Sequence, residues 1–277
     1  MAQKEVFTIE QVNKIEEVAV NKNDKELFRQ LACLYEIGDV VEKDLKKAIN
    51  FWEKAASLGD EVSCCFLGDL FFFNHKSEKD IKLARAWYEK AAYQGNTYGE
   101  LQSGILYFLY ANKKKECILA RKYLMDCRKS EKEAFYWLGL LYQNGKGVKQ
   151  NTKKAIQYWK EGIKLGSVSC LQEYGLTLFG KAKEKKEKKS AIKYLKKAAE
   201  KGYPKGISLI GSYYLFGLGV KNNAKKAVRL LIKASKSEDY ESLLLVGFCY
   251  AIGYGIKKDV DKGIRYWKKG IELKSSK

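Results

Sequence analysis

The sequence contains a single histidine, His75, and no CxxC pair. One histidine leaves most zinc ligand sets unfilled, and no Ser/His/Asp or Cys/His catalytic set can be assembled around it. We therefore expect no metal site, no cofactor and no catalytic residues, and hence a protein that is not an enzyme. Arginine is also scarce, at six of the 53 basic residues. Because arginine is the usual residue for bidentate phosphate contacts, its scarcity argues against specific nucleic-acid recognition.

Long apolar runs are missing as well. No stretch without a charged residue, Leu243 to Ile256 included, reaches the roughly 20 residues of a membrane-spanning helix. Residues 1–20 mix glutamate and lysine and lack the apolar centre of a secretory signal, so we expect a cytoplasmic protein without a transmembrane segment. Its cysteines are odd in number and irregularly spaced, which favours reduced thiols. They are Cys33, Cys64, Cys65, Cys117, Cys127, Cys170 and Cys249.

The chain is strongly basic, with a net charge of +20. Such a charge suits an acidic protein partner, a polyanion or an anionic membrane surface, but a lysine-rich solvated surface is the simpler explanation. The segment from Lys181 to Lys201 holds ten lysines, three glutamates and one aromatic residue, Tyr194. It is either a solvated loop and helix face or a patch for an acidic partner, and its near lack of aromatic residues disfavours base stacking.

Repetition dominates the rest of the sequence. A small residue recurs every 35 or 36 positions, at Ala32, Gly68, Gly104, Gly139, Gly175, Gly211 and Gly247. A second small residue follows each after 16 positions, at Ala48, Ala84, Ala120, Ala155, Ala191, Ala227 and Gly263. Large apolar residues stand three positions after the first small residue, and three and four after the second. This pattern predicts two helices per repeat that approach closely at the small residues and enclose aromatic core side chains.

The predicted helices carry recognisable end signals. Glycines suited to a left-handed C-cap end four second helices, at Gly59, Gly95, Gly166 and Gly202. Predicted N-caps of first helices are Asp60, Asn96, Ser167 and Asp239, and those of second helices are Asp44, Asp80, Asn151, Asn223 and Asp259. Pro204 falls in a first turn, where its missing N–H costs nothing. Near the N-terminus, Thr8 and Gln11 have the spacing of a capping box, which predicts a helix from Thr8 to Val20.

The pattern resembles the Sel-1-like repeat, a relative of the tetratricopeptide repeat. In the fourth repeat the likeness is carried by Leu138-Gly139, Tyr142, Gly145, Gly147-Val148, Lys154-Ala155 and Trp159. In the seventh it is carried by Val246-Gly247, Tyr250, Gly253, Gly255-Ile256, Asp259 and Trp267. The second, third and fifth repeats lack the glycine turn, so we expect less regular turns there. The resemblance implies an all-α, right-handed superhelical solenoid of seven antiparallel helix pairs.

We divide the chain into an N-terminal tail and capping helix (1–27), a repeat array (28–273) and a C-terminal tail (274–277). The seven repeats cover about 28–59, 60–95, 96–130, 131–166, 167–202, 203–238 and 239–273. Terminal repeats need their apolar face covered, which is the role expected of the N-terminal helix.

The resemblance implies a non-catalytic scaffold or adaptor that binds protein partners, and bacterial members of the family include host-interaction factors, which keeps secretion open. Some cysteine-rich members are described as binding or hydrolysing β-lactams. An enzyme of that kind is one alternative function, although this sequence lacks a cysteine pair in each repeat. A basic polyanion-binding protein is the other alternative.

First helices of helix-pair solenoids usually line the concave surface, where partners commonly bind. Positions one and four after the first small residue should face that side, and they are unusually apolar. We therefore predict a groove for a partner peptide or helix, with contributions from Phe72, Phe108, Tyr136, Leu140, Gln143, Phe179 and Phe248. Tight superhelical winding could instead bury these side chains, and the sequence leaves both possibilities open.

Overall fold

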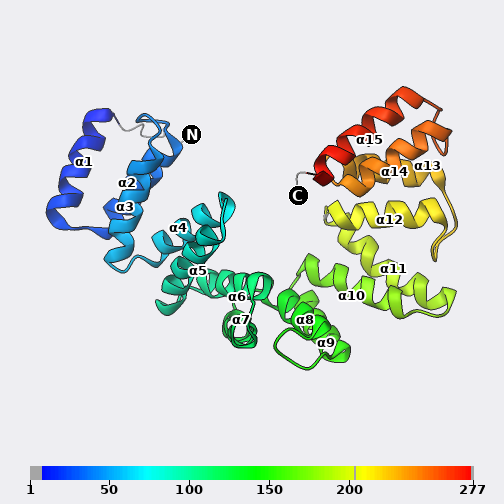
Figure 1. Cartoon of the computed structure of the whole chain (residues 1–277), viewed down its shortest axis with the longest axis horizontal. Helices are drawn as coiled ribbons and strands as arrows, with labels where there is room; N and C mark the ends of the chain where they lie inside the picture. The colour runs from blue at the N-terminus through cyan, green and yellow to red at the C-terminus, as the bar shows by residue number, and fades with distance from the viewer. Residues whose placement is uncertain (1–7, 203, 276–277) are drawn as a thin grey trace, which may run out of the picture. The chain divides into compact units, whose positions relative to one another are not determined.

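The computed structural model describes residues 8–202 and 204–275, and within these ranges every regular element is an α-helix (Figure 1). The helices are α1 (Ile9–Lys22), α2 (Lys25–Ile37), α3 (Leu45–Ser57), α4 (Glu61–Phe73), α5 (Glu78–Tyr93), α6 (Thr97–Tyr110), α7 (Lys114–Cys127), α8 (Ala134–Asn144), α9 (Thr152–Lys164), α10 (Val168–Lys181), α11 (Lys185–Glu200), α12 (Pro204–Phe216), α13 (Ala224–Ser235), α14 (Tyr240–Ile252) and α15 (Val260–Ser275). Seven helix pairs follow α1, which confirms the predicted all-α repeat solenoid. The hand of the superhelix stays a prediction.

The helices group into two compact units. The first comprises Met1–Trp137 and Asn144–Gln150, and the second Leu138–Gln143 and Asn151–Lys277. The predicted repeat at 131–166 therefore contributes to both. The predicted tail at 1–7 lies outside the described residues, as do the last two residues of the chain, whereas α15 runs on through the first two residues of the predicted C-terminal tail.

Helix α1 begins with the predicted capping box. The backbone N–H of Thr8 donates to Oε1 of Gln11 at 2.7 Å, and the N–H of Gln11 donates to Oγ1 of Thr8 at 3.2 Å. The helix continues beyond Val20 to Lys22. Its buried residues, Val12 and Ala19, join the core of the first helix pair, so α1 covers an apolar face that would otherwise meet water.

In six of the seven pairs, the small residue of the first helix is a glycine that packs against the second helix of the same pair, as predicted. A Cβ atom added to Gly68 would lie 2.6 Å from the ring of Tyr88, and one added to Gly104 would lie 2.7 Å from Leu124. Such contacts are closer than carbon atoms tolerate, so glycine is what allows the two helix backbones to approach. The same contact is made by the glycines of the later pairs, at Gly139, Gly175, Gly211 and Gly247.

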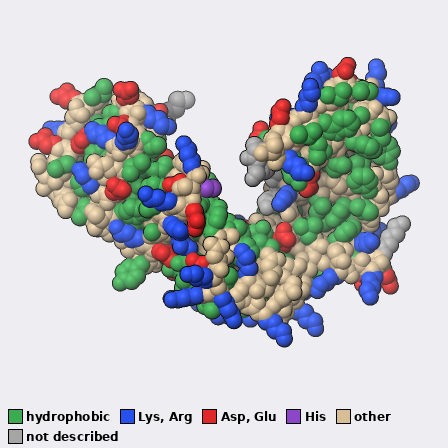
Figure 2. All heavy atoms as spheres, viewed as in Figure 1, with side chains coloured by type: hydrophobic (Ala, Val, Ile, Leu, Met, Phe, Trp, Pro, Cys, Tyr) green, Lys and Arg blue, Asp and Glu red, His purple; other side chains and the backbone are tan. Residues whose placement is uncertain are grey.

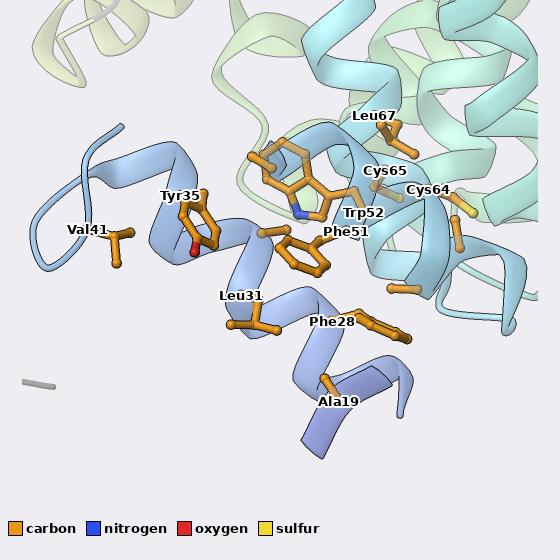
Figure 3. Close-up of a cluster of buried hydrophobic side chains, with 14 of the residues drawn as sticks. Ala19, Phe28, Leu31, Tyr35, Val41, Phe51, Trp52, Cys64, Cys65 and Leu67 are labelled. Carbon is orange, nitrogen blue, oxygen red and sulfur yellow. The ribbon is translucent and has the colours of Figure 1, made fainter. Parts of the chain in front are cut away.

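Aromatic side chains fill the space around these close approaches. In the first unit, Trp52 is 1% exposed, and the ring of Phe51 stacks on those of Phe28 and Tyr35 at centroid distances of 6.0 and 5.9 Å (Figure 3). Full burial of one large apolar side chain contributes about 1.5–3 kcal/mol, so a few such residues per pair dominate its stability. The repeated aromatic residues are therefore core material, as their recurrence predicted.

The turns between paired helices are of two kinds. Repeats one, four, six and seven have a long turn, at 38–44, 145–151, 217–223 and 253–259. Its last residue is the predicted N-cap of the second helix, and the backbone N–H of that residue donates to the carbonyl oxygen of an aromatic residue in the first helix. These pairs are Asp44 to Tyr35 (3.0 Å), Asn151 to Tyr142 (2.8 Å), Asn223 to Tyr214 (2.9 Å) and Asp259 to Tyr250 (2.9 Å).

Repeats two, three and five share a short turn, at 74–77, 111–113 and 182–184. An acidic residue at the third position of the second helix accepts two successive backbone N–H groups from this turn. Asp80 accepts from Lys76 and Ser77, Glu116 from Asn112 and Lys113, and Glu187 from Lys183 and Glu184, at 2.8–3.2 Å. Two predictions are thus corrected: Ser77, not Asp80, is the N-cap of α5, and these turns repeat a second regular form.

The junctions between repeats follow the predicted caps. Asp60, Asn96, Ser167 and Asp239 each accept a backbone N–H from the residue three positions later. The residue before each of the first three is a glycine with a φ near +82°, such as Gly59. Before Asp239 the corresponding residue is Glu238, which adopts a φ of +55° without being glycine. This junction therefore holds an ordinary side chain in a conformation that L-residues disfavour.

Candidate functional site

The predicted groove residues are divided between the two units. Phe72, Phe108 and Tyr136 belong to the first, and Leu140, Gln143, Phe179 and Phe248 to the second. Their exposures differ widely: Phe108 is buried, Phe248 is 40% exposed, and the other five are half-buried. A role for any of them in binding stays a prediction.

Phe108 has the environment of a core residue. It is 6% exposed, and its ring lies edge-on to Trp137 at a centroid distance of 5.4 Å. The ammonium group of Lys146 lies 4.8 Å from the ring centroid and also donates to the carbonyl oxygen of Phe108. Both neighbours come from the next repeat, so Phe108 packs between successive repeats of the first unit. This burial is the alternative that the sequence had left open for the groove residues.

Phe72 and Phe179 are partly covered by aromatic neighbours. The ring of Phe72 lies 5.3 Å from that of Phe73 and 5.9 Å from that of His75, and Phe179 stacks on Tyr213 at 4.4 Å. Helix geometry explains why these two side chains are partly buried. Successive residues of a helix are rotated by about 100°, so the position four after the small residue lies only about 40° from the core-facing direction.

The position five after the small residue lies about 140° from the core-facing direction and is exposed in every repeat. It is occupied by Ile37, Phe73, Leu109, Asn144, Gly180, Phe216 and Ile252. Five of these seven are large and apolar, and Phe73 is 74% exposed. We call these five the outer row. Sequence reasoning missed it by weighing only the positions one and four after the small residue, although the same alignment of repeats contains the signal.

Outer-row residues occur in both units. In the first they are Ile37, Phe73 and Leu109, and in the second Phe216 and Ile252. Figure 2 shows hydrophobic side chains gathered over the C-terminal helices of the second unit. An isolated exposed apolar residue needs no explanation, but the same exposed position in successive repeats marks a surface that a partner could cover.

Lysines recur next to the aromatic residues of the long-turn repeats. The third residue of the second helix is a lysine in all four, and its ammonium group lies over the tyrosine ring of the first helix. The distances to the ring centroids are 4.3 Å for Lys47 and Tyr35, 4.4 Å for Lys154 and Tyr142, 4.6 Å for Lys226 and Tyr214, and 4.7 Å for Lys262 and Tyr250. Each such cation–π contact is worth about 0.5–1 kcal/mol at an exposed site.

The cysteines form no disulfide within the described part of the chain. Burial raises the pKa of Cys64 to about 11 and that of Cys65 to about 12, so both thiols remain protonated near neutrality. His75 is exposed, with Nδ1 lying 2.6 Å from the carbonyl oxygen of Phe72. Among the described residues, no three histidine, cysteine or acidic side chains are grouped so that they could hold a metal ion. Of the helices described, none is long and apolar enough to cross a membrane.

Comparison with solved structures places the fold among helical repeat proteins. A Sel1 repeat protein from Oxalobacter formigenes superimposes with a TM-score of 0.76 at 23% identity, over 95% of this chain and 77% of that one. The protective antigen c5321 of uropathogenic Escherichia coli, which displays the SLR fold, gives a TM-score of 0.51 at 21% identity, over 98% and 68% of the two chains. Yeast Tom70 gives 0.60 at 15% identity, over 95% of this chain and 54% of its own. These likenesses establish the fold alone.

The sequence carries the family assignment. Among curated proteins no sequence matches the chain significantly. The family model described as Sel1 repeat matches residues 29–60, 62–96, 132–167, 169–203, 204–239 and 241–275. Between the second and third matches, α6 and α7 form a helix pair of the same kind, with Gly104 packed on Leu124. The chain belongs to the Sel1 repeat family, as its repeats predicted.

Proposed function

We propose that this chain is a non-catalytic scaffold that binds a segment of a partner protein on the exposed side of its first helices. The observation that carries the proposal is the outer row, an apolar residue at the same exposed position in five of seven repeats. Solenoids of helix pairs present such repeated positions as extended binding surfaces. A partner helix or extended peptide could cover several of them within one unit, which would remove their apolar area from water.

Photo-crosslinking tests this function directly. Phe73 of the first unit and Phe216 of the second would each be replaced by p-benzoylphenylalanine, which keeps an aromatic ring at the site. Tyr93 is the matched control, because it is an exposed aromatic residue, 94% accessible, at the end of a second helix. In cells of the source organism, we expect one dominant protein adduct at Phe73 or Phe216 that is missing at Tyr93.

The partner identified in the adduct is then purified, and its affinity is measured for the wild-type chain and for the Phe73→Ser and Phe216→Ser variants. Loss of an exposed apolar anchor in a covered interface costs more than about 1 kcal/mol, so binding should weaken by about fivefold or more at the correct position. Adducts that are the same at Tyr93 as at the two outer-row positions would contradict the proposal.

The enzymatic alternative makes a separate demand. A β-lactam-hydrolysing protein would turn over a chromogenic cephalosporin with an activity that co-purifies with the chain through successive columns. A scaffold of the proposed kind has no such turnover, so persistent activity would replace this proposal with the alternative.

A further inference from the structure

A cavity of about 1040 Å³ lies in the second unit, between α11 and the turn that leads from α12 to α13. Six lysines line it: Lys186, Lys189, Lys193 and Lys196 from α11, Lys221 from the turn, and Lys226 from α13. Among the described residues that line it, none is an aspartate or a glutamate. We call this site the lysine groove. Several like charges in one hollow, with no carboxylate between them, create a strong positive potential that attracts anions.

Tyr214 of α12 is one of the residues that line the lysine groove. The ammonium groups of Lys226 and Lys196 lie 4.6 and 5.4 Å from the centroid of its ring. Hydrogen bonds from Lys196 and Lys226 lower the pKa of the Tyr214 hydroxyl. The phenol thus contacts two ammonium groups, and its neutral oxygen accepts hydrogen bonds from them without neutralising their charge.

The first repeat holds the same pair in a neutralised form. There Lys47 lies over Tyr35, as Lys226 lies over Tyr214, but a carboxylate completes the group. Nζ of Lys47 donates to Glu16 at 2.8 Å and to the Tyr35 hydroxyl at 2.7 Å, and that hydroxyl donates to the same Glu16 oxygen at 3.2 Å. Glu16 comes from the helix that precedes the repeat. In the lysine groove the preceding second helix supplies Lys196 instead.

We propose that the lysine groove binds an acidic segment of a partner protein, with an aspartate or glutamate carboxylate taking beside Tyr214 and Lys226 the place that Glu16 takes beside Tyr35 and Lys47. This inference rests on the proposed scaffold function and specifies the chemistry of a partner. The length of the lysine-lined helix, from Lys186 to Lys196, allows several carboxylates to be bound in succession.

Two features favour a peptide over a nucleic acid. The groove contains lysine but no arginine, and lysine acts as a point charge without the bidentate geometry that suits phosphate. Tyr214 is the one aromatic residue in the lining as far as the structure describes it. Its ring is flanked by two ammonium groups, so it offers little free surface for base stacking.

The test measures the affinity of a fluorescein-labelled oligoglutamate peptide by fluorescence anisotropy. Lys196→Glu places beside Tyr214 and Lys226 a carboxylate like the one that Glu16 of α1 places beside Tyr35 and Lys47. It should neutralise the site and lower the affinity by about tenfold or more. Lys233→Glu on α13 is the matched control, since it makes the same charge change at an exposed lysine outside the lining, and it should weaken binding by less than about threefold. Lys221→Glu, exposed in the turn, tests the same groove if Lys196→Glu lowers the helical content.

Equal losses for Lys196→Glu and Lys233→Glu would overturn the inference, because binding would then follow overall charge. Tighter binding of oligothymidylate or inorganic polyphosphate than of the peptide, lost in the same variants, would overturn the choice of partner. The scaffold proposal is tested independently. A partner crosslinked at Phe73 or Phe216 would still support it even if the peptide did not bind at the lysine groove.

Discussion

The α carbon of Gly68 faces the ring of Tyr88 so closely that an added Cβ atom would lie 2.6 Å from a ring carbon. Tyr88 is itself fixed, because its hydroxyl donates to a carboxylate oxygen of Asp69 at 2.6 Å and its side chain is fully buried. The ring cannot move aside without losing that hydrogen bond. This contact joins the two helices of the second repeat.

Gly68→Ala is therefore expected to destabilise the protein by about 1–3 kcal/mol through overpacking. Gly180→Ala is the matched control, since Gly180 also lies in a first helix but has no atom within 4 Å of an added Cβ. There the better helix propensity of alanine should stabilise by about 0.5–1 kcal/mol. Urea denaturation followed by circular dichroism measures both, and changes of the same sign would contradict the close-packing argument.

Glu238→Gly is expected to raise stability. Glu238 holds a φ of +55° at a junction where Gly202, one repeat earlier, has +81°. A non-glycine residue in the left-handed region destabilises the folded state by about 1–2 kcal/mol. Glycine avoids this cost, but its greater conformational entropy in the unfolded chain offsets part of the gain. The net gain should be about 0.5–1 kcal/mol. The reverse change, Gly202→Glu, should destabilise, and because an added Cβ atom there meets nothing within 4 Å, its effect isolates the backbone conformation.

The short-turn repeats should be sensitive to acid. Backbone N–H groups that bond to Asp80, Glu116 and Glu187 hold the pKa of each carboxyl below its ordinary value. A lowered pKa in the folded state stabilises the protein above the ordinary value of 4.5 for glutamate, and this stabilisation is lost as the pH falls through the lower, folded-state pKa.

Glu116→Gln and Glu187→Gln should each reduce the loss of stability on going from about pH 7 to about pH 3, because the variant has no proton to bind at that site. Thermal denaturation at the two pH values measures the difference. Glu161, exposed on α9 within a long-turn repeat, provides the control substitution. An unchanged acid dependence in both short-turn variants would show that these carboxylates do not stabilise the turns.

Phe108 and Phe73 should separate packing from binding. Phe108→Ser removes a ring that is 6% exposed and should cost about 3 kcal/mol or more. Phe73→Ser changes a surface residue and should alter stability by no more than about 0.5 kcal/mol. Differential scanning calorimetry of the two variants measures both effects, and a Phe108→Ser protein as stable as the wild type would contradict the packing role of Phe108.

The regular parts of this fold could be predicted because the same residue pattern recurs in each repeat. The spacing of Gly68, Gly104 and Gly139 located the first helices, and the caps at Thr8, Asp44 and Asn151 were recognisable from local chemistry alone. The same local rules misplaced the start of α5, because Asp80 fits an N-cap as well as it fits the third position of a capping box whose N-cap is Ser77.

The candidate sites were harder to predict, since they depend on direction and on contacts between repeats. The outer row differs from Phe72 and Phe108 by a single residue along the helix, and a rotation of about 100° decides which of them meets water. The lysine groove joins Lys196 of one repeat with Lys226 of the next, and only their common contact with Tyr214 distinguishes these two lysines from the many others on the surface.

The two turn types also bear on how such an array can change over time. A short turn is compensated by an earlier start of the next helix, so α5 begins at Glu78 and α11 at Lys185 while the period of the repeat is kept. One form can therefore be converted into the other by point substitutions alone, without insertion or deletion. In a solenoid built this way, the turn of one repeat can change while the neighbouring repeats keep their spacing and their packing.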